Sequence, residues 1–305
     1  MARAAARVSL RLRLVNLFLR LFEKPYLAWE KRHTRARRRL RFASRFFLGP
    51  WRAHYRETEL AGLPAIEARC DPAGPGTLLW FHGGAFVLGS RRTHRKLAGA
   101  LACEGACRVL LPDYRLAPEH PFPAAQDDAL ACYRALLRDC PADSIAIGGD
   151  SAGGGLAFSL LHAIGAEGLP KPACILAFSP WTDLTLGSPW LERNARADPM
   201  LPASRMREVA ALVLAGADAR DPLASPVFGA FDNPPPALIQ VGDSEILRGD
   251  AEAMAERLKA SGGEVALQIW RGTPHVWQIM AGWLPEADAA LEAAGVFLRR
   301  NLPQR

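Results

Sequence analysis

From residue 60 onward, short apolar runs alternate with amphipathic segments along the chain. The apolar runs predict buried strands, and segments whose apolar positions recur three and four residues apart predict helices. The expected strands span 64–69, 77–81, 108–112, 144–148, 174–178, 236–241 and 265–270. The expected helices lie near 93–104, 124–138, 152–166, 250–261 and 285–299. Strands that alternate with helices in this way predict an α/β fold, with a parallel sheet covered by helices on both faces.

The first fifty residues show no strand pattern and instead predict two basic amphipathic helices. The first helix covers residues 7–22, and its apolar positions at helical spacing are Val8, Leu12, Val15, Leu19 and Phe22. The second begins after Pro25 and ends near Phe47, with a nearly continuous basic strip from Arg35 to Arg41.

A second segment also interrupts the alternation of strands and helices. Residues 183–226 lie between two expected strands and are long enough to form a small cap element. We therefore expect an N-terminal helical segment over 1–50 and an α/β domain over 51–305, with 183–226 as a second cap insertion. The length of 305 residues requires no further domain, because α/β folds routinely reach this size.

Basic residues are concentrated in the N-terminal segment. Residues 1–50 contain twelve arginines and two lysines against two glutamates, which gives them a formal charge of +12. The whole chain has a formal net charge of +7, so the remaining residues together carry −5. Without a known binding module, this distribution argues against a nucleic-acid partner. Three roles stay open: a lid packed on the body, which we favour, weak attachment of residues 1–48 to an anionic lipid surface, or a solvated leader. A homodimer also stays open.

The sequence indicates neither a secretory signal nor a metal site. The apolar run Leu14–Leu19 is interrupted by Asn16 and stopped by Arg20, which makes it too short for a signal peptide. The six cysteines form no C-x-x-C pair and have no histidine at ligand spacing; they are Cys70, Cys103, Cys107, Cys132, Cys140 and Cys174. We expect reduced, mostly buried thiols in a cytoplasmic protein without a metal or cofactor.

The motif Gly149–Gly153, with the sequence Gly-Asp-Ser-Ala-Gly, has the form G-x-S-x-G. It lies between the expected strand 144–148 and the expected helix 152–166. This context predicts a nucleophile elbow, in which the hydroxyl of Ser151 projects from a sharp turn. Glycines on both sides of the serine leave room for that turn. The alternative is a glycine-rich turn that binds phosphate.

The expected strand 77–81 ends in the run His82–Phe86, with the sequence His-Gly-Gly-Ala-Phe. Consecutive glycines leave backbone N–H groups accessible to a developing oxyanion. We therefore expect an oxyanion hole formed by Gly83 and Gly84, with the N–H of Ala152 as the third donor. His82 is expected to brace this loop and not to act as a base.

Several motifs together resemble one family. The runs from His82 and Gly149, and above all the segment Asp113–Ala125, are similar to those of hormone-sensitive-lipase-type (family IV) esterases of the α/β-hydrolase fold. The runs Ser179–Leu184 and Asp221–Pro226 fit the same pattern, so the resemblance extends from about residue 50 to the C-terminus. It implies an eight-stranded, mostly parallel sheet, caps from the N-terminus and mid-chain, and a triad of serine, histidine and acid. Ala85 replaces a glycine that is frequent in the family.

His275 is the candidate general base, because it lies in a short loop after the last expected strand, from which it can reach the elbow. The resemblance places the acid two residues before a leucine in the loop after strand 236–241. Counting back from Leu247 gives Glu245, where the family usually has aspartate. Hydrolases of this fold accept either acid. Asp243, in the same loop, is the rival.

These residues predict a serine hydrolase that cleaves small-molecule esters with short to medium acyl chains. Ser151 would attack the carbonyl, His275 would move the proton, and Glu245 would orient the imidazole. Amides and lactones share this mechanism and stay as alternative substrates. A ligand-binding protein on the same fold is the remaining alternative, and the presence of His275 disfavours it.

Overall fold

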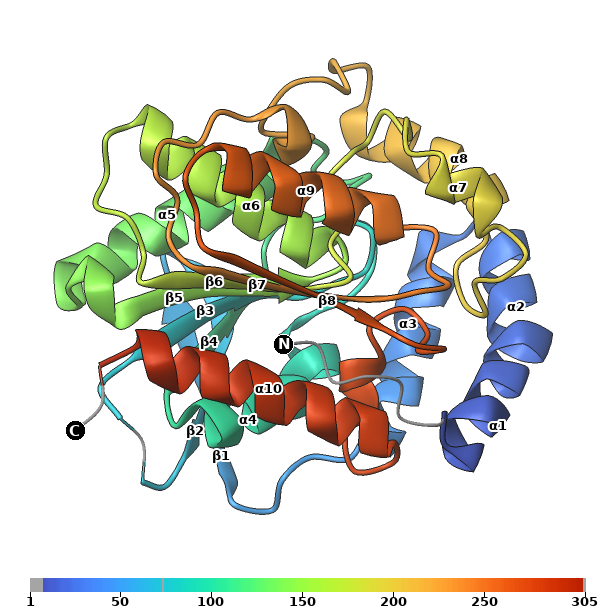
Figure 1. Cartoon of the computed structure of the whole chain (residues 1–305), viewed down its shortest axis with the longest axis horizontal. Coiled ribbons are helices and arrows are strands. Elements are labelled where there is room, and N and C mark those ends of the chain that lie inside the picture. Colours follow the sequence, from blue (N-terminus) through green and yellow to red (C-terminus); the bar gives the residue numbers. More distant parts are fainter. Residues whose placement is uncertain (1–7, 73, 304–305) are drawn as a thin grey trace.

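An eight-stranded sheet forms the centre of the protein (Figure 1). The computed structural model describes residues 8–72 and 74–303. The strands are β1 (Ala53–Leu60), β2 (Leu63–Cys70), β3 (Thr77–Phe81), β4 (Arg108–Pro112), β5 (Ile145–Asp150), β6 (Cys174–Phe178), β7 (Ala237–Gly242) and β8 (Val265–Trp270). Their order is β1-β2-β4-β3-β5-β6-β7-β8. Strand β2 pairs antiparallel with both β1 and β4, and all the other pairs are parallel. This order confirms the mostly parallel sheet that the resemblance implied.

Helices cover both faces of the sheet, as the alternating pattern predicted. On one face lie α4 (Arg91–Gly105) and α10 (Pro285–Asn301), and on the other lie α5 (Ala124–Asp139), α6 (Ala152–Ala166) and α9 (Arg248–Ala260) (Figure 1). Every residue of the central strands β5 and β6 is buried. Burial on both faces explains why these strands are continuous apolar runs in the sequence.

The edge strand β1 is the one strand that the sequence pattern missed. The seven expected strands are all present, each within two residues of its expected bounds. Strand β1 has the sequence Ala-His-Tyr-Arg-Glu-Thr-Glu-Leu, and none of its residues is buried. A polar edge strand of this kind is recognised by its antiparallel pairing with β2 and not by an apolar face.

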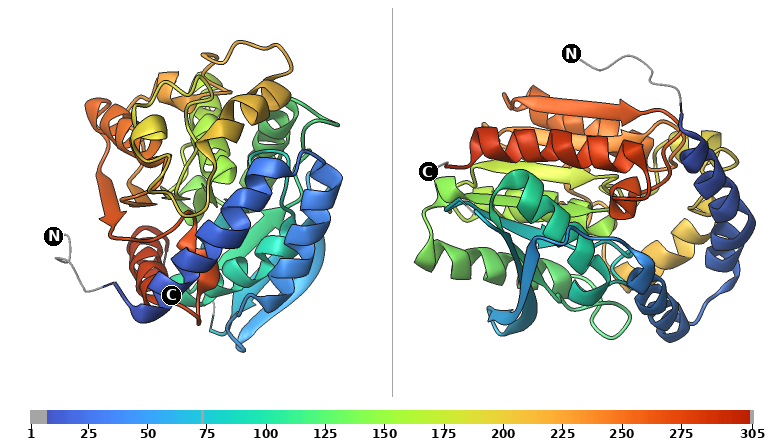
Figure 2. Two further views of the ribbon diagram at one scale, coloured as in Figure 1. Left: turned by 90° about the vertical axis from the view of Figure 1, so that its right-hand side faces the viewer. Right: turned by 90° about the horizontal axis from the view of Figure 1, so that it is seen from below.

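The N-terminal segment and the mid-chain insertion lie together at the carboxyl ends of the parallel strands (Figures 1 and 2). Their elements are α1 (Leu10–Phe18), the π-helical turn η1 (Leu19–Glu23), α2 (Lys24–Trp29), α3 (His33–Ala43), the 3-10 turn η2 (Ser44–Phe46), α7 (Trp190–Arg193) and α8 (Ala203–Leu214). The remaining 3-10 turns are η3 (Ala142–Ser144), η4 (Pro226–Phe228) and η5 (Trp277–Met280). Within the described ranges, no helix combines the length and the apolar character needed to span a bilayer.

The inner face of α1 and η1 follows most of the predicted apolar stripe. Leu12 and Leu19 are buried, and Val8 and Val15 are half-buried against the body. Phe22 is exposed, contrary to the expectation. The π-helical turn η1 explains the difference, because the extra residue in its turn rotates the following positions away from the stripe.

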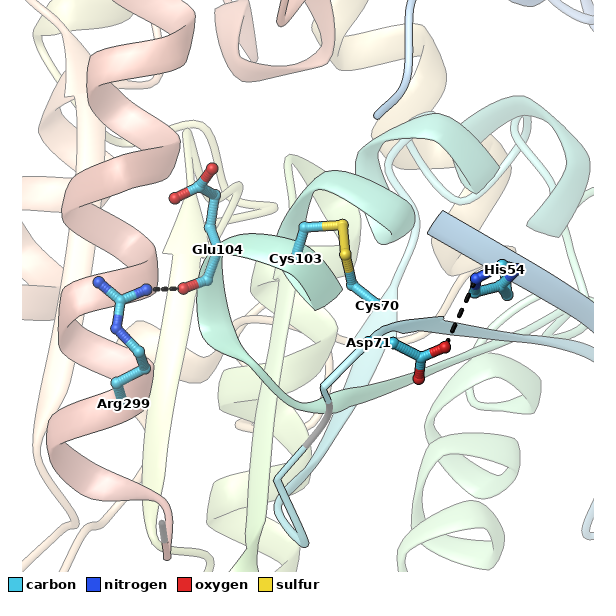
Figure 3. Close-up of a disulfide and its surroundings, with 6 residues drawn as sticks. All are labelled: His54, Cys70, Asp71, Cys103, Glu104 and Arg299. Carbon is cyan, nitrogen blue, oxygen red and sulfur yellow. Dashed lines mark hydrogen bonds and ion pairs between the residues drawn. A yellow bond between two sulfur atoms is a disulfide. The ribbon is translucent and has the colours of Figure 1, made fainter. Parts of the chain in front are cut away.

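A disulfide joins Cys70, at the end of β2, to Cys103 on α4 (Figure 3). The expectation of reduced thiols is therefore wrong for this pair, and the cytoplasmic location loses the support that it drew from the cysteines. The bond ties the antiparallel edge of the sheet to the helix packed beneath it. On either side of the bond, His54 pairs with Asp71, and Arg299 of α10 donates to the carbonyl of Glu104. The other four cysteines are free.

We expect the Cys103→Ser variant to lose about 4 kcal/mol of unfolding free energy, because the bond closes a loop of 33 residues in the unfolded chain. Thiol titration of the denatured, unreduced protein should find four free thiols in the wild type and one more in the variant. Cys140→Ser, at a free and half-buried cysteine, is the matched control and should be nearly neutral. Six titratable thiols in the unreduced wild type would contradict the disulfide.

Candidate active site

Ser151 occupies the sharp turn between β5 and α6. Its φ of 54° and ψ of −122° lie outside the regions that side chains ordinarily adopt. Three backbone hydrogen bonds hold this conformation: the Ser151 N–H donates to the carbonyl of Phe178, and the Ser151 carbonyl accepts from the N–H groups of Gly155 and Trp181. A Cβ at Gly153 would lie 2.0 Å from the carbonyl oxygen of Phe81, so only glycine permits this approach of helix and strand. The predicted nucleophile elbow is present.

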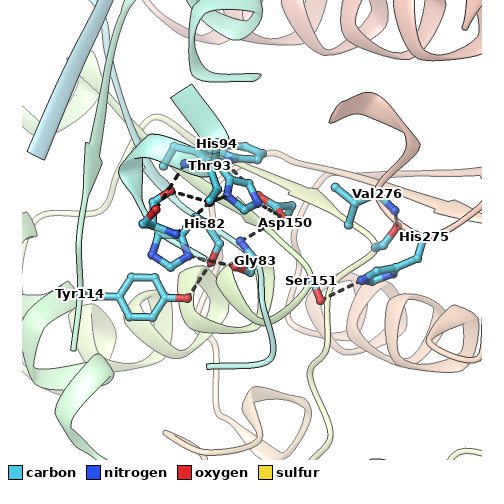
Figure 4. A network of polar contacts seen from close by, with 12 residues as sticks. His82, Gly83, Thr93, His94, Tyr114, Asp150, Ser151, His275 and Val276 are labelled. Carbon is cyan, nitrogen blue, oxygen red and sulfur yellow. Dashed lines mark hydrogen bonds and ion pairs between the residues drawn. The ribbon is translucent and has the colours of Figure 1, made fainter. Parts of the chain in front are cut away.

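His275 links Ser151 to Glu245 through both of its ring nitrogens. Its Nε2 lies 2.9 Å from Ser151 Oγ, and its Nδ1 lies 2.7 Å from Glu245 Oε2. Figure 4 shows the serine and the imidazole facing each other. All three side chains are buried. The structure therefore brings together three residues that come from the loops after β5, β7 and β8.

Glu245 is held in place by its second carboxylate oxygen. Oε1 accepts hydrogen bonds from the N–H of Gly242 at 2.6 Å and from the hydroxyl of Ser179 at 2.8 Å, which leaves Oε2 for the imidazole. The rival, Asp243, instead accepts a hydrogen bond from the N–H of Gly272 at 2.8 Å. Asp243 thus braces the loop that leads to His275, and Glu245 contacts the imidazole itself.

The surroundings of His275 favour its protonated form. Burial alone lowers the pKa of the imidazole, but the hydrogen bond and charge of Glu245 outweigh this effect, and the charges of Asp198 and Asp150 act in the same direction. The pKa of His275 therefore lies above its usual value. A raised pKa makes the imidazole a stronger base toward the serine hydroxyl.

The carboxylate of Asp150, directly before the serine, accepts three hydrogen bonds inside the protein. Its Oδ1 accepts from Trp80 Nε1 at 3.1 Å, and its Oδ2 accepts from Gly83 N–H at 2.9 Å and lies 3.2 Å from His94 Nε2 (Figure 4). Burial raises the pKa of Asp150, but the charge and hydrogen bond of His94 outweigh it, so the net pKa is lowered. The sequence contained this aspartate within the motif but gave no signal for its partners.

His82 braces the loop after β3, as expected. Its ring lies between those of His94 and Tyr114, with centroid distances of 5.5 and 4.4 Å, and its Nδ1 lies 2.9 Å from the carbonyl of Gly83. The hydroxyl of Tyr114 donates to the carbonyl of His82 at 2.6 Å (Figure 4). Burial, and the nearby charge of His94, lower the pKa of His82 to about 4, so the ring is neutral near pH 7.

The expected oxyanion donors require one correction. The N–H of Gly83 is already bonded to Asp150, so it is not free to bind an oxyanion. The chain then turns through positive φ at Gly84 and Ala85, at 125° and 55°. Within the described part of the chain, the N–H groups of Gly84, Ala85 and Ala152 have no acceptor. In the loop after β3, the free amides are therefore those of Gly84 and Ala85, one residue later than the expected Gly83 and Gly84.

The N-terminal helices contact the loops that carry these residues. Asn16 of α1 donates to the carbonyl of Gly272 at 2.7 Å, close to His275. Lys24 of α2 donates to the carbonyl of Asp198, whose carboxylate in turn accepts from the N–H that follows Glu245. Arg37 of α3 donates to the carbonyl of Val87, in the loop after β3. The N-terminal segment thus contacts three separate loops near these residues.

Comparisons with known proteins agree with this geometry. A family model described as the α/β-hydrolase fold matches residues 78–279. An acetyl-hydrolase of Streptomyces hygroscopicus is 44% identical over 225 residues, which are 73% of this chain and 75% of that protein. An esterase of Acinetobacter venetianus is 34% identical over 77% of this chain and 78% of its own length.

Solved structures are similar over almost the whole chain. A crystal structure of an esterase from the bacterial hormone-sensitive lipase family superposes with a TM-score of 0.91 and is 37% identical in sequence. The match covers 98% of this chain and 100% of that one. Such extensive identity goes well beyond a shared fold. The protein is therefore a carboxylesterase-like hydrolase, and it belongs to the hormone-sensitive-lipase-type esterases of the α/β-hydrolase fold.

Proposed function

We propose that this carboxylesterase cleaves esters of short to medium acyl chains through an acyl-enzyme on Ser151. The observation that carries the proposal is the continuous chain of hydrogen bonds from Ser151 through His275 to Glu245, at 2.9 and 2.7 Å. The relative named acetyl-hydrolase supports the short end of the range. Amides and lactones, which react by the same steps, are the second choice.

The reaction would proceed in two acyl-transfer steps. His275 Nε2 takes the proton of Ser151 as the serine oxygen attacks the ester carbonyl, and it then gives that proton to the departing alcohol. Water, deprotonated by the same nitrogen, releases the acid from the acyl-serine. Glu245 keeps the proton on Nδ1 and stabilises the imidazolium that forms in each step.

The negative charge on the carbonyl oxygen would be held by the backbone. We assign this role to the N–H groups of Gly84, Ala85 and Ala152, because these amides are free in the described structure and that of Gly83 is not. Backbone donors fixed before the reaction need no reorganisation, and each contributes on the order of 100-fold or more to the rate. Asp150 positions this group through its bond to Gly83.

Residues 1–50 and 183–226 would act as two parts of a cap over the acyl pocket. The proposal rests on the contacts of Asn16, Lys24 and Arg37 with the loops around the site. A cap built from segments far apart in sequence would shape the pocket and thereby set the acyl preference. The contact between His275 Nε2 and Ser151 Oγ argues against a role as a non-catalytic binding protein.

We expect Ser151→Ala to abolish hydrolysis of p-nitrophenyl acetate, butyrate and octanoate while the unfolding midpoint stays unchanged. Loss of the nucleophile should lower kcat by a factor on the order of 10⁶. Ser159→Ala, which removes another buried serine hydroxyl from the same region, should keep full activity. A Ser151→Ala protein that retains a tenth of the activity would exclude this residue as the nucleophile.

In the wild type, kcat/KM should fall from the p-nitrophenyl ester of octanoate to that of palmitate.

Glu245→Gln should lower kcat by a factor of about 10⁴, because the amide favours the wrong imidazole tautomer and cannot balance the imidazolium charge. Asp243→Asn should cost only about tenfold, since a loop-bracing hydrogen bond contributes on the order of 1 kcal/mol. A greater loss in Asp243→Asn, with folding intact, would reverse the assignment of the acid.

The pH profile of the same two variants separates charge from position. The base must be neutral to accept the serine proton, so kcat/KM falls as the pH drops through the pKa of His275. Glu245 raises that pKa in the wild type, and Glu245→Gln should therefore move the acidic limb to lower pH. Asp243→Asn should leave the limb where it is.

Asp150→Asn should lower kcat by about 10- to 100-fold with little change in KM, because in either orientation the amide nitrogen would face a donor, at Trp80 or at Gly83 and His94, and the resulting shift would displace the oxyanion amides. Trp80→Phe, which removes the hydrogen bond to Oδ1 alone, is the matched control and should cost much less. An unchanged kcat in Asp150→Asn would show that the aspartate does not position the loop.

A further inference from the structure

The outer side of α1 and η1 carries an apolar stripe that nothing in the described structure covers. Its members are Leu10, Leu14, Leu17, Phe18, Leu21 and Phe22, and each is more than half exposed. They are spaced three, four and seven residues apart and therefore lie along one side of the helix. The opposite side of the helix holds the buried Leu12 and Leu19. Because these two residues pack on the body of the protein, the apolar stripe faces solvent.

The stripe continues onto the neighbouring helix through Trp283. Arg11 of α1 donates to the Trp283 carbonyl, and the Trp283 indole donates to the carbonyl of Phe46. Phe46 and Phe42 lie with their rings 5.6 Å apart, and Trp283, Phe42 and Phe46 are all more than half exposed. Figure 2 (left) shows α1 and α3 on the same face of the molecule. These nine apolar residues form what we call the docking face.

Positive charge surrounds the docking face. Exposed arginines flank the stripe at Arg11, Arg13 and Arg20, and further exposed arginines lie on α3 and η2. Arg38 and Arg41, which have no carboxylate partner in the described ranges, line a cavity of about 310 Å³ beside the N-terminal turn of α4. The cavity therefore offers guanidinium donors with the geometry that phosphate oxygens accept. The first fifty residues carry +12 and the rest of the chain −5.

We propose that the docking face binds the surface of an anionic phospholipid bilayer. The Leu, Phe and Trp side chains would enter the boundary between headgroups and acyl chains, and the arginines, including Arg38 and Arg41, would contact lipid phosphates. A second copy of the chain fits less well, because a symmetric contact would bring two equally basic faces together. The helix would then lie between the bilayer and the loop of His275, which its inner residue Asn16 contacts.

The test is co-sedimentation of the full-length protein with vesicles of phosphatidylcholine containing about 30% phosphatidylglycerol, compared with pure phosphatidylcholine. We expect binding to the anionic vesicles that weakens as salt is added, and much weaker binding to the neutral ones. The Ser151→Ala protein should bind as tightly as the wild type, so the result stands apart from whether the enzyme hydrolyses esters.

Two double variants separate the apolar and the electrostatic contributions. Leu14→Ser with Phe18→Ser should lower the partition coefficient by about tenfold or more, since both side chains would leave the lipid boundary. Arg38→Gln with Arg41→Gln should lower the partition coefficient about 25-fold, at about fivefold for each cation near an anionic surface. Inorganic phosphate should compete weakly, because it supplies no apolar phase.

Matched controls remove similar groups elsewhere on the surface. Ile269→Ser with Val296→Ser removes two exposed apolar side chains from β8 and α10, and Arg138→Gln with Lys259→Gln removes two cations from α5 and α9. Both controls should bind as the wild type does. Equal binding to neutral vesicles, absence of vesicle binding, or equal losses in controls and test variants would overturn the proposal. A second result would also overturn it. In that case light scattering would show a dimer, and Leu14→Ser with Phe18→Ser would convert the dimer to a monomer without changing vesicle binding.

Discussion

The buried carboxylate of Asp150 sets the distance between the two loops on which the chemistry depends. It precedes Ser151 in the chain, and it accepts the N–H of Gly83 from the loop after β3. Because an ionised carboxylate can only accept, each of its contacts must be a donor, and Trp80 and His94 supply the others. Ser151 and the free amides that follow Gly83 are therefore placed relative to each other by one buried charged group, and an unsatisfied partner at such a depth would be costly.

Most of the fold, and the three side chains that meet at the candidate site, could be predicted from the sequence, because short motifs determine their local geometry. Strands buried on both faces are continuous apolar runs, and the elbow needs glycines where helix and strand approach within contact distance. The carboxylate that contacts His275 could be predicted as Glu245, because the family resemblance places it two residues before Leu247, within one loop. Such predictions hold where the deciding contacts lie a few residues apart in the chain.

Other features depend on contacts between distant segments, and no local pattern encodes them. The bond between Asp150 and Gly83 decides which amides after β3 stay free. The free amides are therefore those of Gly84 and Ala85, where the sequence analysis expected Gly83 and Gly84. The disulfide arises because α4 packs beneath the end of β2, which brings two cysteines separated by 33 positions together. Strand β1 is mostly polar and has no buried residue, so its pairing with β2 defines it.

The N-terminal helix shows how one periodic pattern can conceal another. The stripe from Val8 to Leu19 and the stripe from Leu10 to Phe22 run along opposite sides of the same turns, and a search for one apolar face finds only the first. Burial of Leu12 and Leu19 orients the helix, and this orientation turns the second stripe toward solvent. A lid and a lipid-binding surface were alternatives as long as the helix was assumed to have a single apolar face. With two faces, the inner one can cover the site while the outer one meets a bilayer, so the two roles are compatible within one helix.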